Sequence, residues 1–105
     1  MSFKVTLSER LPDFPLPVKF VLPNGVEATM VFTVMALTSS ELNEALKNAQ
    51  SQTGAQFVKT LASGWELEDE FSDDNVNKLV DRYPAVVGGL ISVYTQALAG
   101  YRVKN

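Results

Sequence analysis

Asn24 and Gly25 lie between two runs of strand-forming residues and constrain the fold of this chain more than any other local signal. Both residues tolerate the positive φ angles of a two-residue hairpin turn, so the pair predicts a β-hairpin. Its strands are expected over residues 18–22 and 26–37. The return strand would place Met30, Phe32, Val34 and Ala36 on one face and Val31, Thr33, Met35 and Leu37 on the other. Because both faces are largely apolar, we expect helices on one side and a partner on the other.

Three prolines, Pro12, Pro15 and Pro17, precede the hairpin. Proline has no backbone donor, so this stretch is not expected to join a central strand. The pattern favours an extended arm or an edge connector over a recognition motif.

Helix signals fill residues 38–105. Thr38 and Glu41 form a capping box at the start of a first helix, and Ser72 is placed to cap a third. A second helix between them is expected to end at Ser63-Gly64, and Pro84 is expected to end the third and open the fourth. The expected apolar stripes are, in order, Leu42, Ala45, Leu46 and Ala49; Phe57, Val58, Leu61 and Ala62; Val76, Leu79, Val80 and Tyr83; and Val86, Val87, Leu90, Ile91, Tyr94, Leu98 and Tyr101.

Gly88 and Gly89 interrupt the fourth helix pattern, where each glycine costs about 1 kcal/mol relative to alanine. Close packing of a neighbouring backbone would compensate for them. Taken together, the signals predict an α+β fold with one domain over residues 1–105. Its strand-rich part, residues 1–37, would hold an N-terminal β-hairpin and the proline-rich arm. The hairpin would pack against a small bundle of about four helices in residues 38–105.

The residue types present exclude most site chemistries. The chain has no Cys and no His, which removes thiolate and imidazole metal ligands, Cys nucleophiles and His-containing triads. The carboxylates between Glu66 and Asp74 lack the glycine of a calcium loop and fit a solvated linker and helix start. We therefore expect no catalytic, cofactor-binding or metal-binding residue, and not an enzyme.

Charge and hydropathy limit the classes of partner that the chain is expected to bind. The net charge is −3 and the nine Lys and Arg residues are scattered, which argues against nucleic acid. No apolar run resembles a signal peptide or a membrane helix. We therefore expect a soluble intracellular protein.

Four residues are candidates for partner binding: Trp65, Tyr94, Leu98 and Tyr101. Trp65, the single tryptophan, is either an interface anchor or a core side chain whose N–H bonds to the backbone. Tyr94 and Tyr101, seven residues apart on one helix face, are either core or part of a contact stripe. Spare apolar surface on the return strand and the last helix also predicts weak self-association.

From residue 57 onward the order of elements resembles the tail assembly chaperones of long-tailed bacteriophages and prophages. The resemblance is carried by Trp65 before the acidic linker, Phe71-Ser72, Tyr83-Pro84, Tyr94 and the ending from Ala97 to Asn105. The linker is more acidic and less glycine-rich than is usual in such proteins. This difference concerns the conformation of the loop more than the family resemblance.

The resemblance implies a non-catalytic chaperone of the host bacterial cytoplasm that is absent from the mature virion and needs no cofactor. Such proteins bind and solubilise the tape measure protein until major tail protein subunits displace them, so these two proteins are the expected partners. Two alternatives stay open: a structural phage tail or connector component, and a generic bacterial adaptor protein.

Overall fold

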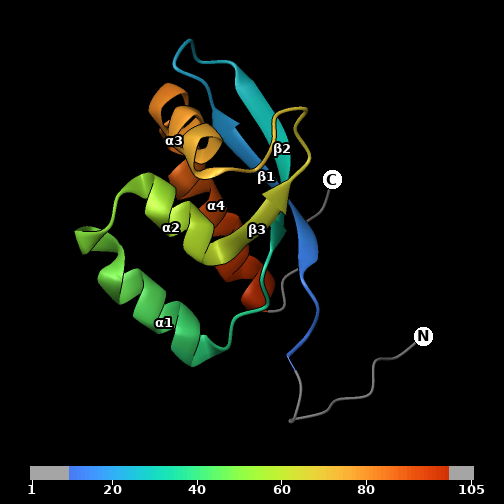
Figure 1. Ribbon diagram of the computed structural model, residues 1–105, viewed down its shortest axis with the longest axis vertical. Coiled ribbons are helices and arrows are strands. Elements are labelled where there is room, and N and C mark those ends of the chain that lie inside the picture. Colours follow the sequence, from blue (N-terminus) through green and yellow to red (C-terminus); the bar gives the residue numbers. More distant parts are fainter. Residues whose placement is uncertain (1–9, 100–105) are drawn as a thin grey trace.

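A computed structural model describes residues 10–99 and contains the hairpin that the Asn-Gly pair predicts (Figure 1). Strands β1 (Phe14–Val21) and β2 (Glu27–Val34) pair antiparallel. Gly25 has a φ of 87°, the left-handed conformation that glycine adopts without strain. The Leu22 N–H donates to the Val26 carbonyl at 2.8 Å and closes the turn. The hairpin is confirmed, with a first strand that begins earlier and a second that ends earlier than expected. The two-residue turn is wrong, because Asn24 has no positive φ and three residues lie between Leu22 and Val26.

The proline-rich stretch is partly a strand, because Pro15 and Pro17 lie within β1. In an antiparallel pair, the backbone N–H and C=O groups of successive residues point alternately toward the partner strand and away from it. The Leu22 N–H bonds to Val26 across the hairpin, so the even-numbered residues of β1 point these groups toward β2. The backbone groups of both prolines therefore face the open edge, where a missing donor removes no ladder bond. The strand order is β1-β2-β3, so the prediction that this stretch avoids a central strand is confirmed.

A third strand, β3 (Ala62–Trp65), pairs antiparallel with the other side of β2. The Glu66 N–H extends this pairing by donating to the Val31 carbonyl at 2.9 Å. The expected helix end at Ser63-Gly64 is wrong, because both residues lie in β3. The preceding helix stops at Leu61, and Ala62 is already extended.

The helices are α1 (Ser39–Asn48), a short 3-10 turn η1 (Ala49–Ser51), α2 (Gly54–Leu61), α3 (Asp73–Arg82) and α4 (Ala85–Leu98). The capping box of Thr38 and Glu41 is present, and the Ser72 hydroxyl accepts from the Asn75 N–H at 3.3 Å. A second capping box at the start of α2, made by Thr53 and Gln56, was not anticipated. Pro84 is the residue before α4 and not its first residue.

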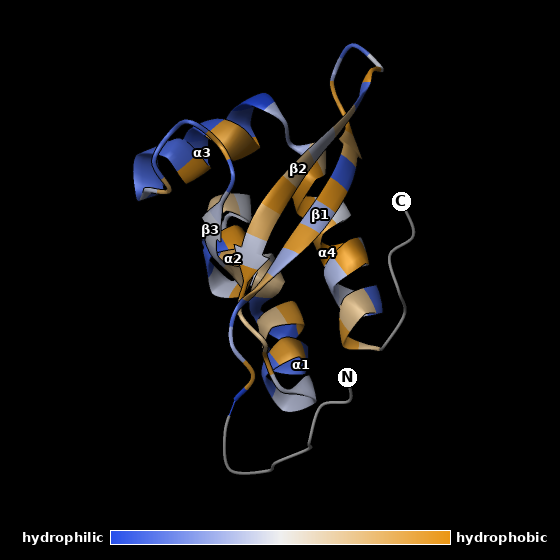
Figure 2. Ribbon diagram, turned by 90° about the vertical axis from the view of Figure 1, so that its right-hand side faces the viewer, coloured by the Kyte–Doolittle hydropathy of each residue, from blue (hydrophilic) through white to orange (hydrophobic). Residues whose placement is uncertain are grey.

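All four helices lie on one side of the sheet (Figure 1). The inner face of the hairpin contributes the buried Leu16, Val18, Phe20, Met30, Phe32 and Val34, as alternation predicts. These side chains form one cluster with Phe57, Val58 and Leu61 of α2, Val76 and Leu79 of α3, and Val86, Leu90 and Tyr94 of α4. No helix within residues 10–99 covers the opposite face of the sheet, which Figure 2 views from the front.

Helix α4 packs directly on β1, and Gly89 allows the close approach. A β-carbon at position 89 would lie 2.7 Å from the Lys19 carbonyl oxygen, whereas one at Gly88 would meet nothing within 4 Å. The expectation that a neighbouring backbone compensates for these glycines is therefore met at Gly89 only.

Tyr94 connects the lower part of α4 to the segment between β2 and α1. Its hydroxyl donates to the Met35 carbonyl at 2.5 Å and accepts from the Leu37 N–H at 3.0 Å. The side chain has no exposed surface, and burial raises the pKa of the phenol. Both hydrogen bonds hold the chain where it leaves the sheet.

Arg10 also forms hydrogen bonds to this segment and to the start of α1. Its guanidinium donates to the Glu41 carboxylate at 2.6 Å and to the Ala36 carbonyl at 3.2 Å. The hydrogen bond from Arg10 lowers the pKa of Glu41. The ion pair of Arg10 with Glu41 stabilises the fold at neutral pH, and this stabilisation is lost as the pH falls through the folded-state pKa of Glu41. The stabilisation is small because both side chains are exposed to solvent.

The two adjacent glycines of α4 provide a matched pair of substitutions. Gly88→Ala is expected to stabilise the protein by about 0.5–1 kcal/mol, because the position is open and alanine favours a helix. Gly89→Ala is expected to destabilise it by about 1–3 kcal/mol, because α4 must move away from β1. Urea unfolding of both variants measures the difference, and equal effects would contradict the close approach.

Tyr94→Phe is expected to lower the free energy of unfolding by about 1–2 kcal/mol, because the partly buried Met35 carbonyl loses its hydroxyl donor and the Leu37 N–H loses its acceptor. Tyr83→Phe is the control, since the Tyr83 hydroxyl makes no hydrogen bond within residues 10–99. The melting temperatures of both variants are measured by thermal unfolding monitored with circular dichroism. Equal melting temperatures for the two variants would show that the Tyr94 bonds contribute nothing.

Candidate partner-binding site

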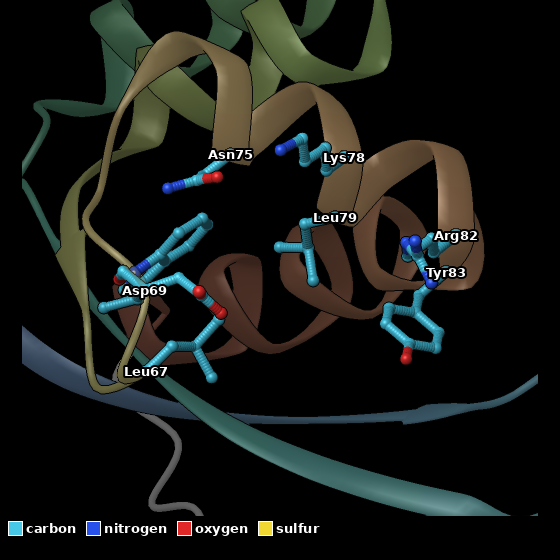
Figure 3. A pocket seen from close by; sticks show the side chains of 8 residues that line it. Leu67, Asp69, Asn75, Lys78, Leu79, Arg82 and Tyr83 are labelled. Carbon is cyan, nitrogen blue, oxygen red and sulfur yellow. The ribbon is translucent and has the colours of Figure 1, made fainter.

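A cleft of about 330 Å³ lies between α3 and the acidic loop of residues 66–72 that leads into it (Figure 3). Its volume is at the lower end of the range for ligand pockets, which suits one or two large side chains. The lining residues are Trp65, Leu67, Asp69, Asn75, Lys78, Leu79, Arg82 and Tyr83.

Two hydrogen bonds to backbone carbonyls position the loop as one wall of the cleft. The Trp65 indole N–H donates to the Asp69 carbonyl at 2.8 Å, and the Asn75 amide donates to the Glu70 carbonyl at 2.7 Å. One bond closes the loop on itself and the other ties it to the first turn of α3. The cleft is therefore formed by a loop with defined attachments.

Trp65 has the backbone hydrogen bond and the core contact that its core interpretation predicts, and its interface role stays a prediction. Its ring packs edge-on against Phe71, with centroids 5.0 Å apart, and lies 6.5 Å from Phe32 in the core. Its N–H is bonded to the backbone, as the core interpretation requires. The side chain is nevertheless only half-buried and lines the cleft, so part of it is accessible to a partner.

The α3 wall carries Lys78 and Arg82, one helical turn apart and both exposed. The same cleft is lined by the apolar side chain of Leu79 and the ring of Tyr83, which packs 6.2 Å from Phe20. This wall therefore combines apolar contact area with a positive edge. It suits a bulky apolar side chain next to a carboxylate, and the eight lining residues include no nucleophile with a neighbouring base.

A second hollow, of about 520 Å³, lies between α2 and α3 and is mainly polar. The ion pair of Lys59 with Asp73 spans it. Within residues 10–99, no group of three acidic side chains is arranged to hold a metal ion. In the same part of the chain, none of the helices has the length and apolar character to cross a bilayer.

Tyr94 and Leu98, which the sequence also predicted, do not lie at the cleft. Tyr94 is fully buried, so the core alternative describes it and we do not retain it as a contact residue. Leu98 is partly buried at the end of α4, about 20 Å along that helix from the cleft end. Tyr101 lies outside the described residues. Of the three candidates within residues 10–99, the structure brings only Trp65 to the cleft.

Lys78 and Arg82 were not among the residues predicted from sequence. The available signal was their spacing of four residues on a helix that also carries Leu79 and Tyr83 one position further on. That pattern alone describes the rim of any amphipathic helix. Only the folded loop opposite α3 turns it into one wall of a cleft.

A family model described as phage tail assembly chaperone matches residues 1–105, which is the whole chain. No match was found among curated proteins or among solved structures.

Asn75→Ala removes the bond that ties the loop to α3 and is expected to loosen one wall of the cleft. Trp65 is the only tryptophan, so its fluorescence reports on this loop. Quenching of Trp65 by acrylamide should increase in Asn75→Ala. It should stay at the wild-type level in Asn77→Ala, an exposed position two residues along the same helix. Equal quenching in both variants would mean that the bond does not hold the loop.

Proposed function

This chain belongs to the phage tail assembly chaperone family, and we propose that it binds and solubilises the tape measure protein during tail assembly. The observation that carries the proposal is the family match over the whole chain, residues 1–105. This match favours the chaperone over the structural tail component and over the generic adaptor.

The cleft offers a mode of binding that suits a long helical partner. An amphipathic helix can place one bulky apolar side chain against Trp65, Leu79 and Tyr83. A carboxylate one turn away on that helix meets Lys78 or Arg82 at the rim. Such a contact is small and therefore weak by itself. Many copies bound along one long partner supply the strength through multivalency.

The proposed action is stoichiometric and not catalytic. The chain has neither Cys nor His, and the side chains that line the cleft are suited to contact through apolar area, charge and hydrogen bonds. Covering apolar surface on the partner needs no nucleotide and no metal. The net charge of −3 keeps the resulting complexes soluble through mutual repulsion.

The timing and location follow from the same proposal. The protein acts in the cytoplasm of the infected bacterium and leaves when major tail protein subunits assemble around the tape measure protein. It is then absent from purified particles. Detection of the protein in mature virions at a fixed copy number would favour a structural tail component instead.

Co-expression with the tape measure protein encoded in the same tail gene cluster tests the central claim. The soluble fraction of that protein is expected to rise several-fold when this chain is present. If the tape measure protein is equally insoluble with and without this chain, the proposal fails.

Substitutions in the cleft test whether the cleft is the surface that contacts the tape measure protein. Leu67→Ser and Lys78→Glu alter the cleft and are expected to reduce the soluble yield of the partner. Leu11→Ser and Lys47→Glu are the matched controls, because they change exposed residues of the same types away from the cleft. Equal yields with cleft and control variants would move the contact to another surface.

A further inference from the structure

Asn24 and Gly25 form the only Asn-Gly pair in the chain and lie in the turn between β1 and β2. An asparagine side chain in such a pair is open to attack by the backbone nitrogen of the glycine, because glycine has no side chain to shield that nitrogen. Residues 23–26 are all exposed, and a β-carbon at position 25 would meet nothing within 4 Å. The tip of the hairpin also projects beyond the helices (Figure 2). Residue type and exposure therefore favour reaction at this site.

The hydrogen bonds of the turn oppose the reaction. The Gly25 N–H donates to the Leu22 carbonyl at 2.8 Å, and the Val26 N–H donates to Oδ1 of Asn24 at 3.0 Å. When a backbone amide loses its proton, the electron pair that attacks lies along the former N–H direction. In the closed turn this direction leads to the Leu22 oxygen and not to Cγ of Asn24. Both reacting groups are therefore held in an arrangement that does not react.

We propose that Asn24 is a site of succinimide formation that the closed turn protects and that reacts when the hairpin tip opens. In the open turn, base removes the proton from the Gly25 nitrogen, and this nitrogen forms a bond to Cγ of Asn24. The adduct takes a proton from water and releases ammonia, which leaves a five-membered cyclic imide. Water then adds to one of the two imide carbonyls and opens the ring to aspartate or isoaspartate.

The two products have different effects on the turn. An aspartate at position 24 keeps an oxygen that accepts from the Val26 N–H, so the turn closes again. An isoaspartate routes the main chain through the side-chain carbons and lengthens it by one atom. The Leu22 backbone bonds to both Gly25 and Val26, and the longer chain does not fit the spacing of these two bonds. A transient opening of the tip thereby becomes a permanent change, and either product adds one negative charge to the net charge of −3.

The other asparagines within residues 10–99 are less suited to this reaction. All of them lie in α1 or α3 and precede a residue with a side chain: Asn43, Asn48, Asn75 and Asn77. That side chain crowds the attacking nitrogen, and in a helix the N–H of the next residue points along the axis toward an earlier carbonyl. The Val76 N–H, for example, donates to the Ser72 carbonyl at 2.8 Å. We therefore expect Asn24 to react first in this part of the chain.

Comparison of the folded full chain with the same chain unfolded in urea tests the protection. Both samples are incubated in mildly alkaline buffers that differ only in urea, and the converted fraction of Asn24 is followed by mass spectrometry of proteolytic peptides. Because two hydrogen bonds must break before the reaction, conversion is expected to be at least about ten-fold slower in the folded chain. Asn24→Asp supplies the chromatographic standard that separates the aspartate product from the isoaspartate product.

Two matched proline substitutions test whether the barrier lies in the turn. Pro23 follows Leu22 in the turn and restricts its backbone, so Pro23→Gly is expected to open the tip more often and to speed conversion in the folded chain several-fold. Pro12→Gly makes the same change at an exposed position outside the hairpin and should leave the folded rate at the wild-type value. In urea, all three chains are expected to react at the same rate. Circular dichroism verifies that each variant is folded before incubation.

Three results would overturn the inference. One is an equal rate of conversion in the folded and the unfolded wild type, since the turn would then give no protection. Another is a different asparagine that reacts faster than Asn24 in urea. The third is an equal acceleration by Pro23→Gly and Pro12→Gly, which would make global unfolding, and not opening of the tip, the step that exposes the site. None of these measurements involves the tape measure protein, so this inference and the proposed function stand or fail separately.

Discussion

At Gly89 the last helix comes so close to the first strand that a β-carbon would lie 2.7 Å from the Lys19 carbonyl oxygen. This approach lets α4 bury Val86 and Leu90 in the core beneath the sheet. One turn beyond Leu90, the Tyr94 hydroxyl bonds to the backbone at Met35 and Leu37. A single helix thus fixes the edge strand of the sheet and the point where the chain departs for α1. The positions of α2 and α3 follow, because both pack into the same cluster.

Placing all helices on one side makes the two sides of the sheet different. The outer face carries Lys19 and Glu27 beside the apolar Val21 and Val31, and no helix within residues 10–99 covers it. On the helix side, the chain crosses from β3 to α3 through the acidic loop. The bonds of Trp65 and Asn75 fix that loop, and a cleft lies between it and α3.

Local signals predicted most elements because their causes are local. Asn24-Gly25 produced the hairpin, Thr38 and Ser72 started their helices, and the alternation of β2 separated its buried face from its exposed one. Predictions failed where a distant segment decided the outcome. Ser63-Gly64 suits a helix end, but pairing with β2 draws both residues into a strand. Pro15 and Pro17 kept their stretch out of a central strand, as predicted, but only pairing with β2 made it a regular edge strand.

The sequence alone determined the types of element, the absence of thiol and imidazole chemistry, and an order of motifs that already resembled the family now established for residues 1–105. These properties depend on residue type and on neighbours a few positions away. Only the tertiary structure decided that Tyr94 belongs to the core and that Trp65 lines a cleft together with Lys78 and Arg82. The burial of a side chain depends on which segments pack over it, and those segments are set by contacts between residues far apart in the chain.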